Sequence, residues 1–143
     1  MERKSREPIG KYISQLYRKG GTQISKEISN FGIGQGQLMF LTQLYKQDGI
    51  SQEELTEILR IDKGTTARAI KKLEEENLVT RIKDEQDRRA YKVYLTEKAK
   101  SIESNIFEIL REWDEKIVTN LTEEEKETFT RILKKICINH NLR

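Results

Sequence analysis

The chain has 143 residues, a net charge of +3, a charged fraction of 36% and few aromatic residues. This composition suits one elongated, mainly helical domain over residues 1–143. The single cysteine, Cys137, excludes a disulfide framework and a multi-cysteine zinc site, and we expect no metal or cofactor. The first ten residues are charged with no apolar run behind them, and no segment approaches the roughly 18 apolar residues of a membrane span, so we expect a cytoplasmic protein with no membrane contact.

The first predicted element is an N-terminal helix. Its apolar residues repeat at helical spacing, and Pro8 suits a first turn: Ile9, Tyr12, Ile13, Leu16 and Tyr17. Residues 1–30 carry seven basic and three acidic residues, whereas residues 112–127 carry seven acids and two lysines. A basic side of the protein can therefore face a polyanion while an acidic side faces away.

Two short helices follow in close succession. Ser51 and Glu54 form a capping box that predicts the first helix start, and the buried stripe of that helix is expected to be Leu55, Ile58 and Leu59. Asp62 is a good N-cap for the second helix, whose apolar face is expected to be Ala67, Ile70 and Leu73. Only two or three residues separate these helices, which forces a steep crossing. That geometry is typical of a helix-turn-helix, which presents its second helix to the DNA major groove.

The face of the second helix opposite its apolar stripe supplies the candidate DNA contacts, namely Lys63, Thr65, Thr66, Arg68, Lys71 and Lys72. Threonine hydroxyls can reach base edges or phosphates, arginine can bind guanine through two hydrogen bonds, and the two later lysines suit phosphates. An ordinary solvated helix face would look similar in isolation. Three acids at residues 74–76 concentrate the positive charge in the first turns, the end that enters a groove.

A β-hairpin is predicted next, with strands at Val79 to Lys83 and Ala90 to Leu95. The polar residues 84–89 between them form the tip of a wing. Arg88 and Arg89 there can enter a minor groove, and Asp87 can hold one of them by an ion pair. The alternative is a solvated hairpin tip with no partner.

Two C-terminal helices complete the chain. The first is a long helix of about five turns with an apolar stripe at Ala99, Ile102, Ile106, Ile109, Leu110, Trp113 and Ile117. A capping box at Thr122 opens the last helix, with apolar residues Phe129, Ile132, Leu133 and Ile136. The terminal helices have more apolar surface than they can hide from each other, so we infer a homodimer. A two-fold dimer places two recognition helices about 34 Å apart and predicts a pseudo-palindromic operator on double-stranded DNA.

Four short motifs follow one another over the predicted recognition helix and wing: residues 62–66 (DKGTT), Leu73 with residues 77–79 (NLV), Asp84 with residues 87–89 (DRR), and residues 95–99 (LTEKA). In these motifs the chain resembles the multiple-antibiotic-resistance regulator (MarR) family. Where the family often has a Thr-Pro-Pro-Gln helix start, this chain has residues 34–37 (GQGQ), which keeps Gln35 and Gln37 as possible DNA contacts. Asn77 replaces the usual glycine of the "GLV" step and tolerates a left-handed conformation.

The resemblance implies a mainly α-helical fold with a small β-hairpin wing. A winged helix-turn-helix lobe at residues 33–98 would be flanked by dimerisation helices at residues 1–30 and 100–143. It also implies a transcriptional repressor relieved by a small-molecule effector, bound in a crevice near Tyr12, Tyr17 and Phe40. Aromatic residues at helical spacing can equally be core residues. Some members of the family sense oxidants through a cysteine in the first helix, which this chain lacks.

Two other classes of function compete with this interpretation. An enzyme needs a nucleophile or paired acids with an orienting partner, and His140 and Cys137 near the chain end form no such constellation, so we expect no enzyme. Cys137 lies between two isoleucines, which favours an inert thiol over a redox role. A winged-helix module that binds protein instead of DNA would show an apolar outer face on residues 62–72, and this face is basic.

Overall fold

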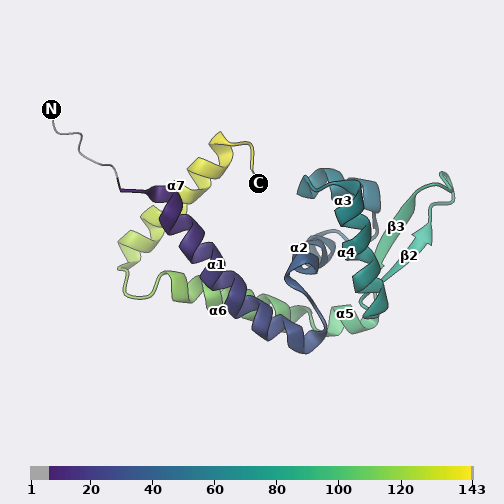
Figure 1. Cartoon of the computed structure of the whole chain (residues 1–143), viewed down its shortest axis with the longest axis horizontal. Coiled ribbons are helices and arrows are strands. Elements are labelled where there is room, and N and C mark those ends of the chain that lie inside the picture. The colour runs from purple at the N-terminus through teal and green to yellow at the C-terminus, as the bar shows by residue number, and fades with distance from the viewer. Residues whose placement is uncertain (1–6, 143) are drawn as a thin grey trace.

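The computed structural model describes residues 7–142 and is mainly helical with one small sheet (Figure 1). In chain order the elements are α1 (Ile9–Ile28), the 3-10 turn η1 (Ser29–Phe31), α2 (Gln35–Lys46), β1 (Ile50–Ser51), α3 (Gln52–Leu59), α4 (Lys63–Glu75), β2 (Val79–Lys83), β3 (Tyr91–Leu95), α5 (Glu97–Ser101), α6 (Glu103–Ile117) and α7 (Glu123–Asn139). Within residues 7–142 no helix combines the length and apolar character needed to cross a membrane.

The predicted helix starts are confirmed at three caps. The Ser51 side chain accepts from the Glu54 amide, Asp62 accepts from the Thr65 amide, and Thr122 forms a reciprocal capping box with Glu125. The return hydrogen bond from the Ser51 amide to the Glu54 side chain, expected for a capping box there, is not formed within residues 7–142. The end of α4 is also as expected, because Asn77 adopts the left-handed conformation with φ of 59°. The Leu78 amide then donates to the Leu73 carbonyl at 2.9 Å, which turns the chain from α4 into the wing.

The predicted hairpin is confirmed within one residue, and a third strand joins it. β2 and β3 are antiparallel, with Arg81 opposite Val93. The two-residue strand β1, which the sequence analysis missed, pairs with the other edge of β3 through Ile50 and Val93, so the order is β1-β3-β2. This extra strand ties the start of α3 to the wing.

The core lies where α2, α3 and α4 meet the sheet, a unit that we call the winged lobe (residues 33–95). Its fully buried side chains include Phe40, Leu41, Leu44, Leu55, Ile70, Leu73, Leu78, Val79 and Val93. The expected stripes of α3 and α4 were partly wrong. Ile58 is 38% exposed. Ile58 lies on the side of α3 that lines a hollow shared with the end of α7, whereas Leu55 and Leu59 pack against the core. In α4, Ile70 and Leu73 are buried as expected, but Ala67 is only half-buried, and Thr66 and Ala69 complete the buried face.

Helices α1, α6 and α7 form an arm on the other side of the molecule, with α1 running beside α6 and α7 beyond them, while the short helix α5 lies beside the winged lobe (Figure 1). The long helix predicted from Ala99 onward is two helices, α5 and α6, because the chain departs from helical geometry at Ile102, with φ of −102° and ψ of 0°. In α1 only Gly20, Gly21 and Ile28 are buried, and α7 has no buried residue. The apolar side chains of these two helices therefore lie largely open.

Candidate DNA-binding interface

The turn between α3 and α4 is closed by hydrogen bonds that involve two threonines. Arg60 takes the left-handed conformation, with φ of 53° and ψ of 46°, and the Ile61 amide donates to the Thr56 carbonyl. The Thr66 hydroxyl donates to the Asp62 carbonyl at 3.0 Å and lies 3.0 Å from the Thr56 hydroxyl. Thr66 is fully buried. Its prediction as a DNA contact was therefore wrong, because this hydroxyl joins α4 to α3.

The basic face of α4 (Lys63, Arg68, Lys71 and Lys72) is exposed as predicted, and no ion pair neutralises any of these four side chains within residues 7–142. The acidic end of α4, in contrast, contacts the wing. Glu74 pairs with Arg81 of β2 at 3.4 Å, and the Arg81 guanidinium lies 5.0 Å from the centre of the Tyr91 ring. These contacts brace the wing against α4, so the helix and the wing present one connected surface.

Thr65 begins the same face and is half-buried. Its hydroxyl donates to Asp62 Oδ2 at 2.7 Å, while the Thr65 amide donates to Asp62 Oδ1 at 2.8 Å. These hydrogen bonds, with the charge of Arg68 as a smaller contribution, hold the pKa of the Asp62 carboxyl below its ordinary value. The cap of α4 is therefore a charged carboxylate at neutral pH, which also suits the positive end of the helix dipole.

The wing tip carries Arg88 and Arg89 with both side chains exposed. The predicted ion pair between Asp87 and a wing arginine is wrong, since none of the ion pairs within residues 7–142 involves Asp87. Asp87 Oδ1 accepts instead from the Arg89 amide at 3.1 Å, and Asp84 Oδ1 accepts from the Gln86 amide at 2.9 Å. The carboxylates shape the turn, since backbone amides two residues along are nearer than any guanidinium.

A groove of about 240 Å³ separates the wing tip from the starts of α3 and α4. Its lining includes Lys63 from α4, Arg89 from the wing and Gln52 from α3. Gln52 Oε1 is buried there with no hydrogen-bond partner within residues 7–142. Lys63 of α4 and Arg89 of the wing, 26 positions apart in the sequence, thus line one groove together with the acidic residues Glu53 and Asp87.

The two glutamines at the start of α2 are used inside the fold. Gln35 Oε1 accepts from the Ser25 hydroxyl of α1 at 3.1 Å, so this exposed side chain lies toward α1, and its contact with DNA stays a prediction. Gln37 Oε1 accepts from the Gly34 amide at 3.0 Å and caps α2. This cap replaces the hydroxyl cap that Gly34 lacks, and a DNA contact through the Gln37 amide nitrogen stays a prediction.

The predicted effector residues do not lie together. A cleft of about 290 Å³ opens between α1, α2 and α6, and it is lined by Tyr17, Gly20, Gly21, Ile24, Gln35, Leu38, Met39, Thr42, Leu110 and Trp113. Only Tyr17 of the three predicted residues is among them. Tyr12 lies one to two turns earlier and donates to Glu7 Oε2 at 3.0 Å. Phe40 is fully buried in the winged lobe, so its prediction as an effector contact was wrong.

Sequence reasoning missed most of this cleft. Gly20 and Gly21 carry no chemistry of their own, yet a methyl group at Gly20 would lie 2.5 Å from the Trp113 ring. The pair of glycines inside a predicted helix was the available signal, because glycine weakens a helix unless something must approach closely.

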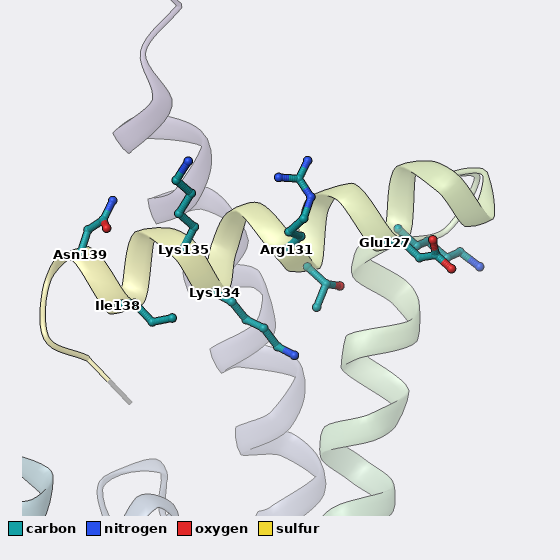
Figure 2. A pocket seen from close by; sticks show the side chains of 8 residues that line it. Glu127, Arg131, Lys134, Lys135, Ile138 and Asn139 are labelled. Carbon is teal, nitrogen blue, oxygen red and sulfur yellow. The ribbon is translucent and has the colours of Figure 1, made fainter.

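A larger hollow, of about 610 Å³, runs along α7 and is shown in Figure 2. All of its lining residues belong to α7, and they include Arg131, Lys134, Lys135 and Ile138. No second element closes this groove within residues 7–142. Cys137 faces a different hollow, of about 560 Å³, between the end of α7 and the end of α3, where Arg60 Nη2 donates to the Asn141 carbonyl at 3.0 Å.

Comparison with known proteins agrees with this geometry. The family model described as "MarR family" matches residues 33–91, which contain α2 to the start of β3. The HTH-type transcriptional regulator BilQ of Clostridium symbiosum is 32% identical over 126 residues, which cover 87% of this chain and 88% of BilQ. The chain belongs to the MarR family. It is therefore a winged helix-turn-helix transcriptional regulator.

Solved structures of MarR regulators have the same fold. A MarR transcriptional regulator from Methanosarcina mazei is 48% identical, with a TM-score of 0.87 over 92% of this chain and 95% of that protein. A MarR-family regulator from Listeria monocytogenes, solved with a 26mer DNA, is 27% identical, with a TM-score of 0.82 over 94% of this chain and 89% of that protein. The elements from α1 to α7 thus follow the architecture of this family.

Proposed function

We propose that this MarR regulator binds pseudo-palindromic DNA as a homodimer, with α4 in the major groove and the wing in the adjacent minor groove. The observation that carries the proposal is the exposed basic face of α4, which forms no ion pair within residues 7–142. Arg89 of the wing lies across a groove that the acids Glu53 and Asp87 also line. Phosphates and guanine edges attract such a surface. An apolar surface at this place would have favoured a protein partner.

The roles of the exposed side chains follow from their positions on α4. Arg68 lies in the second turn, where it can reach a base edge, and its guanidinium can form two hydrogen bonds to guanine O6 and N7. Lys71 and Lys72 lie one turn later and suit phosphates that flank the groove. Arg88 and Arg89 extend from the wing tip, which suits a minor groove.

The homodimer is supported by the apolar surface of the arm. Ile9, Ile13 and Tyr17 of α1 are 70%, 56% and 73% exposed. On α7, apolar side chains that are more than 40% exposed recur at helical spacing: Ile132, Leu133, Ile136 and Ile138. Contiguous apolar surface of this kind marks an interaction site in a protein of this size. A second copy would bring the same two helices and could cover both stripes by two-fold symmetry.

The effector site that we propose is the cleft between α1, α2 and α6. Tyr17, Met39, Leu110 and Trp113 supply apolar walls, while Gln35 and Thr42 supply polar groups. Such a lining suits a small, mainly apolar molecule with a few polar atoms. The cleft lies between the arm and the winged lobe. A ligand that binds more tightly at one angle between arm and lobe would therefore change the spacing of the two α4 helices in the dimer. We propose that this change relieves repression.

The test is selection of bound sequences from random duplex DNA at two salt concentrations, with the mass of the purified protein measured in solution. We expect an enriched inverted repeat with half-sites about 10 base pairs apart and a mass of two chains. Weak, unselective binding that moderate salt abolishes would overturn the proposal and favour a protein-binding module.

Variants assign the contacts on the selected site. Arg68→Ala is expected to weaken specific binding by about 1 to 3 kcal/mol, the value of one good base contact. Arg88→Ala and Arg89→Ala are expected to weaken binding more on sites with an AT-rich flank than on GC-rich ones, because narrow minor grooves attract arginine. Equal losses on both flanks would indicate phosphate contacts only. Lys116→Ala, at the far end of α6, is the matched control for loss of one exposed positive charge.

A further inference from the structure

The Arg68 side chain does not extend freely from α4. Arg68 Nη2 donates to Thr65 Oγ1 at 3.1 Å, and Thr65 Oγ1 in turn donates to Asp62 Oδ2 at 2.7 Å. Since the hydroxyl of Thr65 has one hydrogen and its oxygen has two lone pairs, both partners can be satisfied together. The three side chains thus form one chain of hydrogen bonds that starts at the N-cap.

Gly64 supplies a second, independent observation. A methyl group at Gly64 would lie 3.3 Å from Arg68 Nη1 and 3.3 Å from Asp62 Oδ1. The guanidinium and the carboxylate therefore both lie against the bare backbone at the start of α4. Glycine weakens a helix relative to alanine, and here it leaves the room that the folded-back arginine occupies.

We propose that Asp62, Gly64 and Thr65 form a clamp that positions Arg68 for guanine readout at the N-terminal end of α4. This inference rests on the proposed function, in which Arg68 contacts a base. Thr65 is then a positioning residue: its hydroxyl is committed to Asp62 and Arg68, and it presents mainly its methyl group to DNA.

The clamp is compatible with guanine recognition. A guanidinium has five N–H groups, so four remain after one is given to Thr65, and guanine O6 and N7 use two. Holding the side chain in place before binding removes an ordering cost that a free arginine would meet on docking. The charge of Asp62 close to Arg68 favours the same arrangement.

The experiment compares guanine discrimination in three variants on the selected operator. The guanine read by Arg68 is first defined as the position at which Arg68→Ala loses its base preference. At this position Thr65→Val, which removes the hydroxyl and keeps the shape, is expected to lower discrimination about threefold to tenfold, the range for immobilising one long side chain. Thr65→Ser keeps the hydroxyl and should retain the native value.

Gly64→Ala separates positioning from stability. Alanine favours the helix, so we expect thermal stability equal to or above that of the native protein, together with a threefold to tenfold loss of guanine discrimination. If guanine discrimination in this variant were instead kept or raised together with thermal stability, the clamp would be a structural feature only and the inference would be overturned. This variant also keeps the test decisive should Thr65→Val fail to fold.

Failure of the clamp is distinguishable from failure of the proposed function. If Arg68→Ala loses the guanine preference while Thr65→Val and Gly64→Ala keep it, Arg68 reads the base without a clamp and this inference is wrong. If the native protein selects no sequence at all, the proposed function itself fails. Loss in Thr65→Val with rescue in Thr65→Ser supports the clamp.

Discussion

Replacing Tyr45 with phenylalanine tests the connection between the winged lobe and the helices that follow it. Tyr45 Oη donates to the Ala99 carbonyl at 2.6 Å, and the Tyr45 ring lies 5.7 Å from the ring of Phe107 in α6. Phenylalanine keeps the ring and removes only the hydroxyl. The Ala99 carbonyl still accepts from the Ile102 amide at 3.3 Å. We therefore expect the free energy of unfolding near neutral pH to fall by about 1 kcal/mol.

Alkaline pH gives a sharper expectation for the same variant. Burial of the Tyr45 hydroxyl, assisted by the charge of Glu103, raises the pKa of Tyr45 from 10.0 to about 12. Between these values the unfolded chain has released the proton and the folded chain has not, so the stabilisation falls as pH rises. At about pH 11 the loss in the native protein is at most about 1.4 kcal/mol, and solvent near the half-buried ring reduces it toward about 1 kcal/mol.

The assay is urea unfolding followed by helical circular dichroism, at one protein concentration because association shifts apparent stability. The native protein should exceed Tyr45→Phe by about 1 kcal/mol at about pH 8 and by close to zero at about pH 11. A difference that stays constant over this range would refute the raised pKa. Tyr94→Phe is the matched control at about pH 8, since the Tyr94 hydroxyl of β3 makes no hydrogen bond within residues 7–142 and lies outside the proposed dimer surface, so its loss should leave stability unchanged.

Two further predictions concern the cap of α4 and the cleft. Because the pKa of Asp62 is lowered in the folded protein, its stabilisation is present above its ordinary value of 3.8 and lost as pH falls below it, so the difference in melting temperature between the native protein and Asp62→Asn should narrow in that acidic range. Gly20→Ala should lower stability by about 1 to 3 kcal/mol, because its methyl group must displace the Trp113 ring. Gly10→Ala, in the same helix with nothing within 4 Å of the added methyl group, should raise stability slightly, and equal effects of the two would refute the close contact.

Local signals in the sequence predicted the elements that depend on local chemistry. Hydroxyl and carboxylate caps mark helix starts because they satisfy amides within three residues, which is why Ser51, Asp62 and Thr122 were identified correctly. Alternation of apolar residues marked both wing strands, because successive side chains of a strand point to opposite faces of the sheet. The strand β1 has two residues, and its pairing partner Val93 lies 43 positions away, so no local pattern could indicate it.

The contacts within the site that the sequence did not predict have a common physical origin. Thr66 and Gln35 are polar, and polar residues near a predicted recognition helix invite assignment to DNA. Their hydrogen-bond partners, Thr56 and Ser25, lie ten positions away on another helix, and only the packing of helices reveals them. Phe40 was similarly assigned from its residue type, yet the direction of its side chain depends on how α2 is rotated in the lobe.

Few polar contacts cross between the arm and the winged lobe, and they define where an effector could act. The Ser25 hydroxyl of α1 donates to Gln35 Oε1 of α2, and Arg60 Nη2 donates to the Asn141 carbonyl beyond α7. The hydrogen bonds from Tyr45 to Ala99 and from Lys98 to Glu76 join the lobe to α5 instead. Gln35 also lines the proposed effector cleft. A ligand that takes the Gln35 oxygen from Ser25 would therefore change one of these contacts directly. The change in DNA affinity that a ligand causes is limited by the difference between its affinities for the two arrangements of arm and lobe. A ligand that binds tightly but leaves the Gln35 contact intact need not alter DNA binding.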